Sequence, residues 1–151
     1  MTARLDDQRV DALSFSAPDR PGLPLKIISD GGSHEEMLFR SALAFYTPSL
    51  LSYLAGGLLA REGIQVDEIG IRYPGDELDE GEEPFDGVKL ISPMGEVLVS
   101  LDAFERFMAR YLHAYITWLE EVKDPVIRQP EFDIVRETAT ALSQRAHKTL
   151  G

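Results

Sequence analysis

Cysteine is absent from this chain of 151 residues. Its absence excludes a disulfide scaffold, a thiolate zinc site and a cysteine nucleophile together, and it fits a reducing compartment. Long apolar runs are also missing, since the longest, from Leu50 to Ala60, has 11 residues and falls short of the ~20 that a membrane-spanning helix needs. The first ten residues carry four charges and no apolar segment typical of a signal peptide. We therefore expect a cytoplasmic protein with no membrane contact.

Basic residues are few. Fifteen lysines and arginines stand against 26 aspartates and glutamates, which gives a formal net charge of −11. The imbalance is concentrated between Glu62 and Asp86, where ten acidic residues accompany a single basic residue, Arg72. Nucleic acid binding depends on cations that neutralise phosphates, so we expect no nucleic acid partner. A basic protein is the natural complement of such a segment.

The motifs that identify common catalytic and metal sites are missing as well. Three histidines lie far apart on different predicted elements: His34, His113 and His147. His34 begins a zinc-protease motif, but Leu38 occupies the position of its second histidine. The acidic segment lacks the EF-hand spacing of calcium ligands. Paired carboxylates such as Asp67 and Glu68 leave an enzyme open as a third alternative. We expect no enzyme activity, no cofactor and no metal.

Local signals predict a single α+β domain over residues 1–151, with a small antiparallel sheet of about three strands packed with four helices. The helices are expected over residues 33–46, 47–62, 100–123 and from 130 to near the C-terminus. Ser33 and Ser100 suit helix starts, Ser33 through capping-box spacing with Glu36. Gly63 suits the left-handed position after the second helix. That helix is apolar almost all round, so we expect it to be the most buried.

Apolar alternation predicts the three strands over residues 64–73, 88–91 and 96–99. The sequence Ser92-Pro93-Met94-Gly95 joins the last two and is a strong hairpin signal. Two short strands near residues 13–15 and 25–27 are separated by a stretch rich in proline and glycine. In the second helix, Gly56-Gly57 indicates the close packing of another element.

Seven carboxylates lie between Asp76 and Asp86 without a cation among them. We predict a partner-binding site on this segment: Tyr73, Asp76, Glu77, Asp79, Glu80, Glu82, Glu83 and Asp86. Their self-repulsion has a purpose if they steer a basic partner. The alternative is a solvated loop that only adds solubility. A second candidate surface is the aromatic stripe of Tyr111, Tyr115 and Trp118, whose spacing is typical of a helix core but whose residue types also anchor interfaces.

A hairpin that runs into Val99-Ser100-Leu101-Asp102-Ala103-Phe104, followed by Tyr111 and Tyr115, resembles immunity proteins of bacterial contact-dependent and polymorphic toxin systems. The resemblance implies that the protein neutralises a toxin domain, often a basic nuclease, by covering its active site. An acidic, dimeric secretion chaperone of the type III kind is the alternative function. That alternative requires the helix over residues 100–123 to form a dimer interface, so a homodimer stays open.

Overall fold

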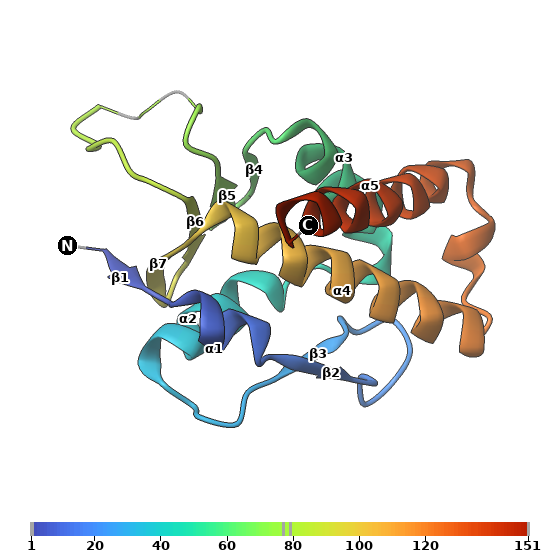
Figure 1. The fold of residues 1–151 in the computed structure, drawn as a ribbon. Coiled ribbons are helices and arrows are strands. Elements are labelled where there is room, and N and C mark those ends of the chain that lie inside the picture. Colours follow the sequence, from blue (N-terminus) through green and yellow to red (C-terminus); the bar gives the residue numbers. More distant parts are fainter. Residues whose placement is uncertain (1, 77, 79, 151) are drawn as a thin grey trace.

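The fold is built around a five-stranded mixed sheet with the strand order β1-β7-β6-β5-β4 (Figure 1). The computed structural model describes residues 2–76, 78 and 80–150, the last four as helix backbone only. The strands of this sheet are β1 (Ala3–Arg4), β4 (Ile64–Val66), β5 (Ile69–Arg72), β6 (Val88–Ser92) and β7 (Gly95–Val99). A second sheet pairs β2 (Ser14–Ser16) with β3 (Lys26–Ile28). The predicted α+β class is confirmed, but the main sheet has five strands and not the three that the sequence predicted.

The described residues form five α-helices rather than four. They are α1 (Asp7–Asp11), α2 (His34–Leu43), α3 (Leu51–Ala60), α4 (Leu101–Glu121) and α5 (Asp133–Leu150). Short 3-10 helices precede α3 and α5: η1 (Pro48–Leu50), η2 (Pro125–Arg128) and η3 (Pro130–Phe132). The four longer helices lie within a few residues of the predicted ranges. The additional helix, α1, is only five residues long and starts at an Asp6 cap that the sequence analysis did not recognise.

Two of the predicted helix starts are confirmed by their caps. Ser100 accepts a hydrogen bond from the backbone N–H of Ala103 at 3.1 Å. Ser33 accepts one from Glu36 at 3.2 Å, and the Glu36 carboxylate reaches back to the N–H of Gly32 at 3.1 Å. The hydroxyl half of the predicted capping box therefore forms, whereas the carboxylate of Glu36 accepts from Gly32 and not from the N-cap Ser33.

The C-terminal end of α3 differs from the prediction. Arg61, not Gly63, adopts the left-handed conformation that ends the helix, with φ of 54°. The chain reverses earlier than expected because α3 ends at Ala60 and β4 begins at Ile64. Gly57 in this helix confirms the predicted close packing, since an added Cβ would lie 2.2 Å from the Ile64 side chain. Its neighbour Gly56 has open space around it, so packing explains only one of the two glycines.

Residues 64–73 form a tight hairpin, so the prediction of a single strand is wrong. β4 and β5 pair antiparallel, with Ile64 opposite Ile71 and Val66 opposite Ile69. The turn contains Asp67, whose φ is 54°, a conformation that aspartate tolerates better than most residues. The irregular alternation in the middle of this segment is the turn itself. At the opposite edge of the sheet β1 pairs parallel to β7, which gives the sheet its mixed character.

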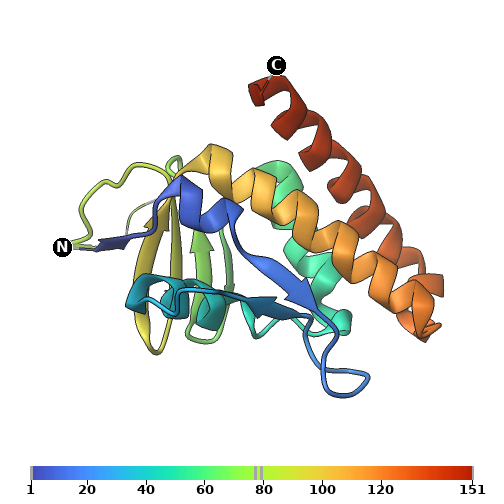
Figure 2. The same ribbon diagram turned by 60° about the horizontal axis from the view of Figure 1, so that its bottom comes forward.

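The most buried helix is α4, and the expectation that α3 would be is wrong. Eleven residues of α4 are buried against four of α3, and Tyr53 of α3 is half exposed. The aromatic stripe is core at Tyr111 and Tyr115, which have no exposed surface, and Phe107 stacks on Tyr111. Its third member, Trp118, is only partly buried. Figure 2 shows α4 running through the middle of the molecule while α5 diverges from it toward the C-terminus. A long helix that is contacted from several sides offers more burial than the shorter α3.

Within the described residues, no single helix is long and apolar enough to cross a membrane. The helix α2 and the segment Pro48–Ala60 meet the length and composition criterion only together, as a pair bent by 77°. Both elements contribute side chains to the buried core, including Phe39 and Leu54.

Candidate partner-binding surface

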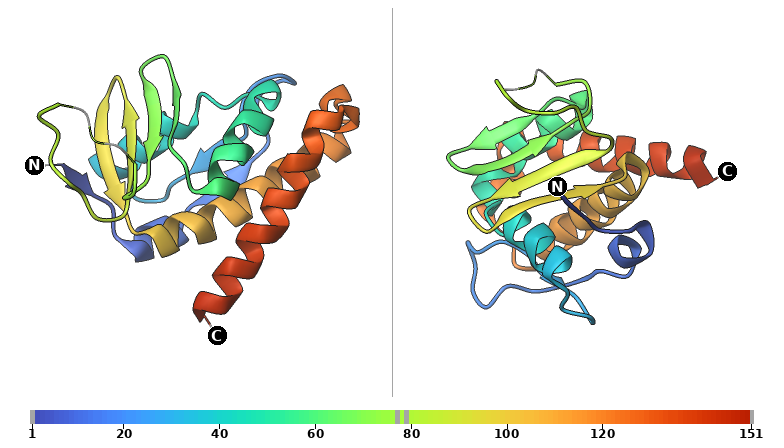
Figure 3. Two further views of the ribbon diagram at one scale, coloured as in Figure 1. Left: turned by 90° about the horizontal axis from the view of Figure 1, so that it is seen from above. Right: turned by 90° about the vertical axis from the view of Figure 1, so that its left-hand side faces the viewer.

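The acidic segment is the connection between β5 and β6, and it borders the face of the sheet that carries no helix. Figure 3 (right) looks onto this face, with the helices behind the sheet. The segment lines an open hollow of about 820 Å³ together with the sheet residues Arg4, Lys89, Glu96 and Leu98. These residues share one face because β6 and β7 pair Lys89 with Leu98, and Arg4 of β1 also lies opposite Leu98. The hollow therefore has both charged and apolar walls.

Glu82 ties the acidic segment to the sheet. One of its carboxylate oxygens accepts a hydrogen bond from Arg72 at 3.0 Å and the other from Lys89 at 3.2 Å. Little of these side chains is exposed: 12% of Arg72, 7% of Lys89 and 15% of Glu82. Lys89 also lies over the ring of Phe85, 4.5 Å from its centroid, in a cation–π contact. The negative charge of the segment is thus partly balanced, because two cations of the sheet, Arg72 and Lys89, lie beside Glu82.

Asp76 and Tyr73 have structural roles. The Asp76 carboxylate accepts hydrogen bonds from the backbone N–H of Tyr73 at 2.7 Å and of Gly63 at 3.3 Å. An added Cβ on Gly63 would lie 2.5 Å from this carboxylate, which explains the glycine. The Tyr73 ring is buried edge-on against Phe104, and burial raises the pKa of its hydroxyl above the ordinary value. Tyr73 therefore does not belong to an exposed site, which corrects the prediction.

Three predicted carboxylates remain exposed, and we call them the acidic rim: Glu80, Glu83 and Asp86. The end of the rim is held by Arg4, which donates a hydrogen bond to the backbone carbonyl of Asp86 at 3.3 Å. Two further predicted site residues, Glu77 and Asp79, lie outside the described residues. The structure thus brings together Glu80, Glu82, Glu83 and Asp86 around one hollow and separates Tyr73 and Asp76 from it.

Replacing Glu82 with glutamine is expected to lower the free energy of unfolding by about 1–3 kcal/mol. The loss arises because Lys89 stays buried and keeps only the more distant Glu96 carboxylate, at 3.8 Å, among the ion pairs of the described residues. The matched control is Glu83→Gln, one residue along the chain and exposed, which should change stability by no more than about 0.5 kcal/mol. Urea unfolding measures all three proteins, and equal stability of the two variants would contradict the anchoring role.

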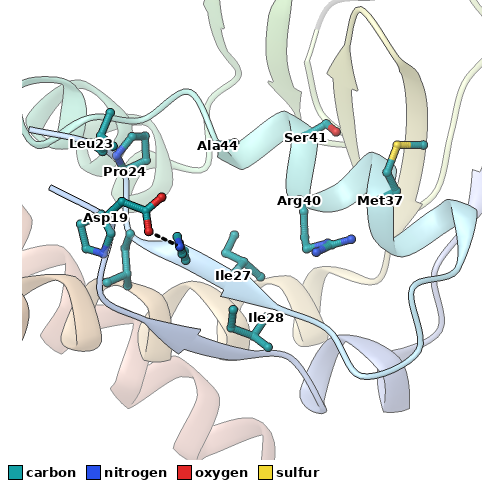
Figure 4. Close-up of a pocket in the computed structure, with 12 residues that line it drawn as sticks. Asp19, Leu23, Pro24, Ile27, Ile28, Met37, Arg40, Ser41 and Ala44 are labelled. Atoms are coloured by element: carbon teal, nitrogen blue, oxygen red, sulfur yellow. Dashed lines mark hydrogen bonds and ion pairs between the residues drawn. The ribbon is translucent and has the colours of Figure 1, made fainter.

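A second candidate surface, which the sequence analysis missed, is the groove between β3 and α2 (Figure 4). It has a volume of about 490 Å³ and is bordered by the Pro18–Pro24 loop as well. The proline- and glycine-rich composition of this loop was the one signal that the sequence contained. The signal was not specific, because it does not indicate which helix lies opposite the strand.

The residue types that would support catalysis are dispersed. Within the described part of the chain, no group of three or more histidine, aspartate and glutamate side chains is placed to hold a metal ion. His113 lies on the exposed side of α4 and contacts the Ser143 hydroxyl at 2.9 Å, while His34 is exposed at the start of α2. The side chain of His147 lies outside the described part. Asp67 and Glu68 form the β4–β5 turn.

No protein-family model matches this chain, and neither a curated protein nor a solved structure does. Function is therefore inferred from these surfaces together with the features of the sequence.

Proposed function

We propose that this chain is a non-catalytic cytoplasmic protein that binds a basic protein partner through the acidic rim. The observation that carries this proposal is the anchoring of the rim by Glu82, which contacts Arg72 and Lys89 on the sheet. An anchored loop loses less conformational freedom when a partner binds than a free loop does. It also keeps the three exposed carboxylates within a fixed area. A loop that only adds solubility needs no such anchor.

The electrostatics of the rim favour a cationic partner. The described charges around the hollow remain negative in sum, because five carboxylates outnumber three cations. The carboxylates are Glu80, Glu82, Glu83, Asp86 and Glu96, and the cations are Arg4, Arg72 and Lys89. Concentrated charge of one sign raises association rates with an opposite partner by roughly 10–10³. We further propose that this partner is a toxin domain, in keeping with the resemblance of the β6–β7 hairpin and the first part of α4, through Tyr115, to immunity proteins. Basic nucleases have the charge that this rim complements.

The alternative function, a dimeric secretion chaperone, is not supported by α4. Its apolar side is covered within the protomer except for the partly buried Leu101 and Trp118, and its exposed positions are all polar: Asp102, His113, Thr117, Glu120 and Glu121. A stable dimer interface has an apolar core. The helix that the chaperone function requires as its interface therefore lacks one.

The proposal is tested by replacing the rim residues together, as Glu80→Gln, Glu83→Gln and Asp86→Asn. Wild-type and variant proteins are immobilised and used to capture partners from the native lysate, and association with the purified partner is then followed by stopped flow. We expect the rim variant to associate about tenfold more slowly at about 0.1 M salt, where the Debye length is ~10 Å. The difference should narrow at about 1 M salt, where that length is ~3 Å.

The control variant removes the same charge elsewhere, as Glu121→Gln, Glu131→Gln and Glu137→Gln, all at exposed positions of α4, η3 and α5. It should associate at close to the wild-type rate. The captured protein should also arrest growth when expressed alone, and coexpression of the wild-type chain should relieve the arrest. Equal rates for the two variants would overturn the rim as the binding site, and a harmless partner would overturn the toxin assignment.

A further inference from the structure

The groove between β3 and α2 combines an apolar floor with an open strand edge. Its lining includes Leu23, Pro24, Ile28 and Met37, and Ile28 is one of the large apolar side chains that are exposed at the surface. The sheet that contains β3 has only two strands, and β2 occupies one side of β3. The other side of β3 faces α2 across the groove (Figure 4). An unpaired strand edge presents backbone N–H and C=O groups that an additional strand can pair with.

The groove also contains a cation, Arg40, whose side chain has no ion-pair partner in the described part of the chain. Arg40 points from α2 into the space above β3 in Figure 4, and its Nε is buried without a hydrogen bond among the described residues. None of the ion pairs of the described residues includes Arg40. The other cation of the groove, Lys26, is already paired with Asp19 at 2.6 Å. Leaving a buried donor without an acceptor costs about 1–3 kcal/mol, so an acceptor is expected at Arg40.

We infer that this groove binds an extended peptide, which adds as a strand to β3 and places a carboxylate on Arg40. Strand addition satisfies the open backbone groups of β3, and alternate apolar side chains of the peptide cover the apolar lining. Arg40 fixes the register, because guanidinium and carboxylate form two parallel hydrogen bonds in a specific geometry. The carboxylate belongs either to an aspartate or glutamate side chain or to the C-terminus of the peptide. This site differs from the acidic rim in position and in the charge that it accepts.

The probe is a library of short random peptides in two formats. In one format the C-terminus of each peptide is free, and in the other both ends are fused to the display protein, so that no free C-terminus is present. Selected peptides are synthesised with a fluorescent label, as free acids and as C-terminal amides, and binding is followed by anisotropy. We expect peptides with alternating apolar residues and one carboxylate, and Arg40→Gln should weaken their binding by about tenfold or more. Loss of binding on amidation identifies the C-terminus as the source of the carboxylate, and unchanged binding identifies a side chain.

Two controls separate this site from an effect of charge or of misfolding. Arg136→Gln removes the same charge from an exposed position on α5 and should leave peptide binding unchanged. Ile28→Glu places a carboxylate in the groove at an exposed position, so it should abolish peptide binding in a protein that still unfolds cooperatively. The triple rim variant should bind peptides as the wild type does.

Hydrogen exchange gives the readout that is specific to strand addition. Amide exchange in residues 25–28 should slow when peptide is bound, and methylation of the peptide amides that face β3 should remove binding. The inference is overturned if neither library yields a binder, if Arg40→Gln and Arg136→Gln bind equally, or if exchange in residues 25–28 does not change.

Discussion

Replacing Gly87 with alanine is expected to lower the free energy of unfolding by more than about 3 kcal/mol. Gly87 has φ of 91°, outside the regions that a residue with a Cβ adopts readily, and it lies directly before β6. An added Cβ would stand 2.3 Å from the backbone carbonyl oxygen of Val99. Val99 pairs with Val88 at the end of the β6–β7 ladder, so relief of the clash requires that pairing to open. The strain and the clash add together.

The control for this substitution is Gly22→Ala. Gly22 has nearly the same φ, 90°, but no atom lies within 4 Å of the position that a Cβ would occupy. This variant should lose only the stability that the backbone strain of an alanine costs, about 1–3 kcal/mol. Urea unfolding gives both losses, and the difference between them isolates the clash with Val99. Equal losses would show that the end of the β6–β7 ladder opens without a loss of stability.

The second large effect is expected in a buried ion network that joins α3, α4 and α5. The carboxylate of Glu105 is buried and accepts hydrogen bonds from Arg61 at 2.6 and 3.0 Å and from Arg145 at 3.0 Å. The hydrogen bond to Glu105 raises the pKa of Arg61 above the ordinary arginine value. A base with a raised pKa stabilises the fold at every pH below its unfolded value. The charge of Arg61 therefore stabilises the fold over the whole physiological pH range.

Removal of the two arginines, as Arg61→Met with Arg145→Met, is expected to lower the free energy of unfolding by about 3–5 kcal/mol. The loss is large because Glu105 is left as a buried charge without its partners. Glu105→Leu should lose less, about 1–3 kcal/mol, since the side chains of Arg61 and Arg145 are 46% and 30% exposed and regain water. In the double arginine variant, the Arg145→Met substitution also removes the hydrogen bond from Arg145 to the Leu59 carbonyl at 2.8 Å.

The triple variant provides the decisive comparison. When all three charges are replaced by apolar residues, no buried charge remains, and such replacements are often close to neutral. We expect the triple variant to recover most of the stability that the double arginine variant loses. Chemical denaturation of the four proteins measures this recovery. A triple variant as unstable as the double would show that the loss comes from packing and not from the isolated carboxylate.

The long helix α4 and the β6–β7 hairpin follow from local signals. Ser100 satisfies a backbone donor three residues away, and the turn Ser92-Pro93-Met94-Gly95 joins two strands that pair directly. Interactions of this range leave a readable pattern, because the residues that make them are near neighbours in the chain. The turn at Asp67, which divides residues 64–73 into β4 and β5, also depends on near neighbours in the chain. It was missed because the alternation of apolar residues in this segment resembled that of one irregular strand.

The candidate site was only partly predictable. The density of carboxylates between Asp76 and Asp86 is visible in the sequence, whereas their division into buried and exposed members is not. Glu82 is paired with Arg72 and Lys89, which lie on two different strands, and only the pairing of β5 with β6 brings those side chains to one place. The groove between β3 and α2 has the same origin, because its two walls are contiguous only in the folded chain.

The sequence by itself determined the helix starts at Ser33 and Ser100, the turn between β6 and β7, the excess of negative charge and the absence of every site that needs a thiol. Each of these depends on residue identity or on neighbours within a few positions. Tertiary structure alone decided that α4 and not α3 lies at the centre, that Tyr73 is buried, and that Arg40 faces a groove without a partner among the residues that the structure describes. Burial and charge pairing depend on which distant segments pack together, and here that packing follows from the summed fit of many small contacts.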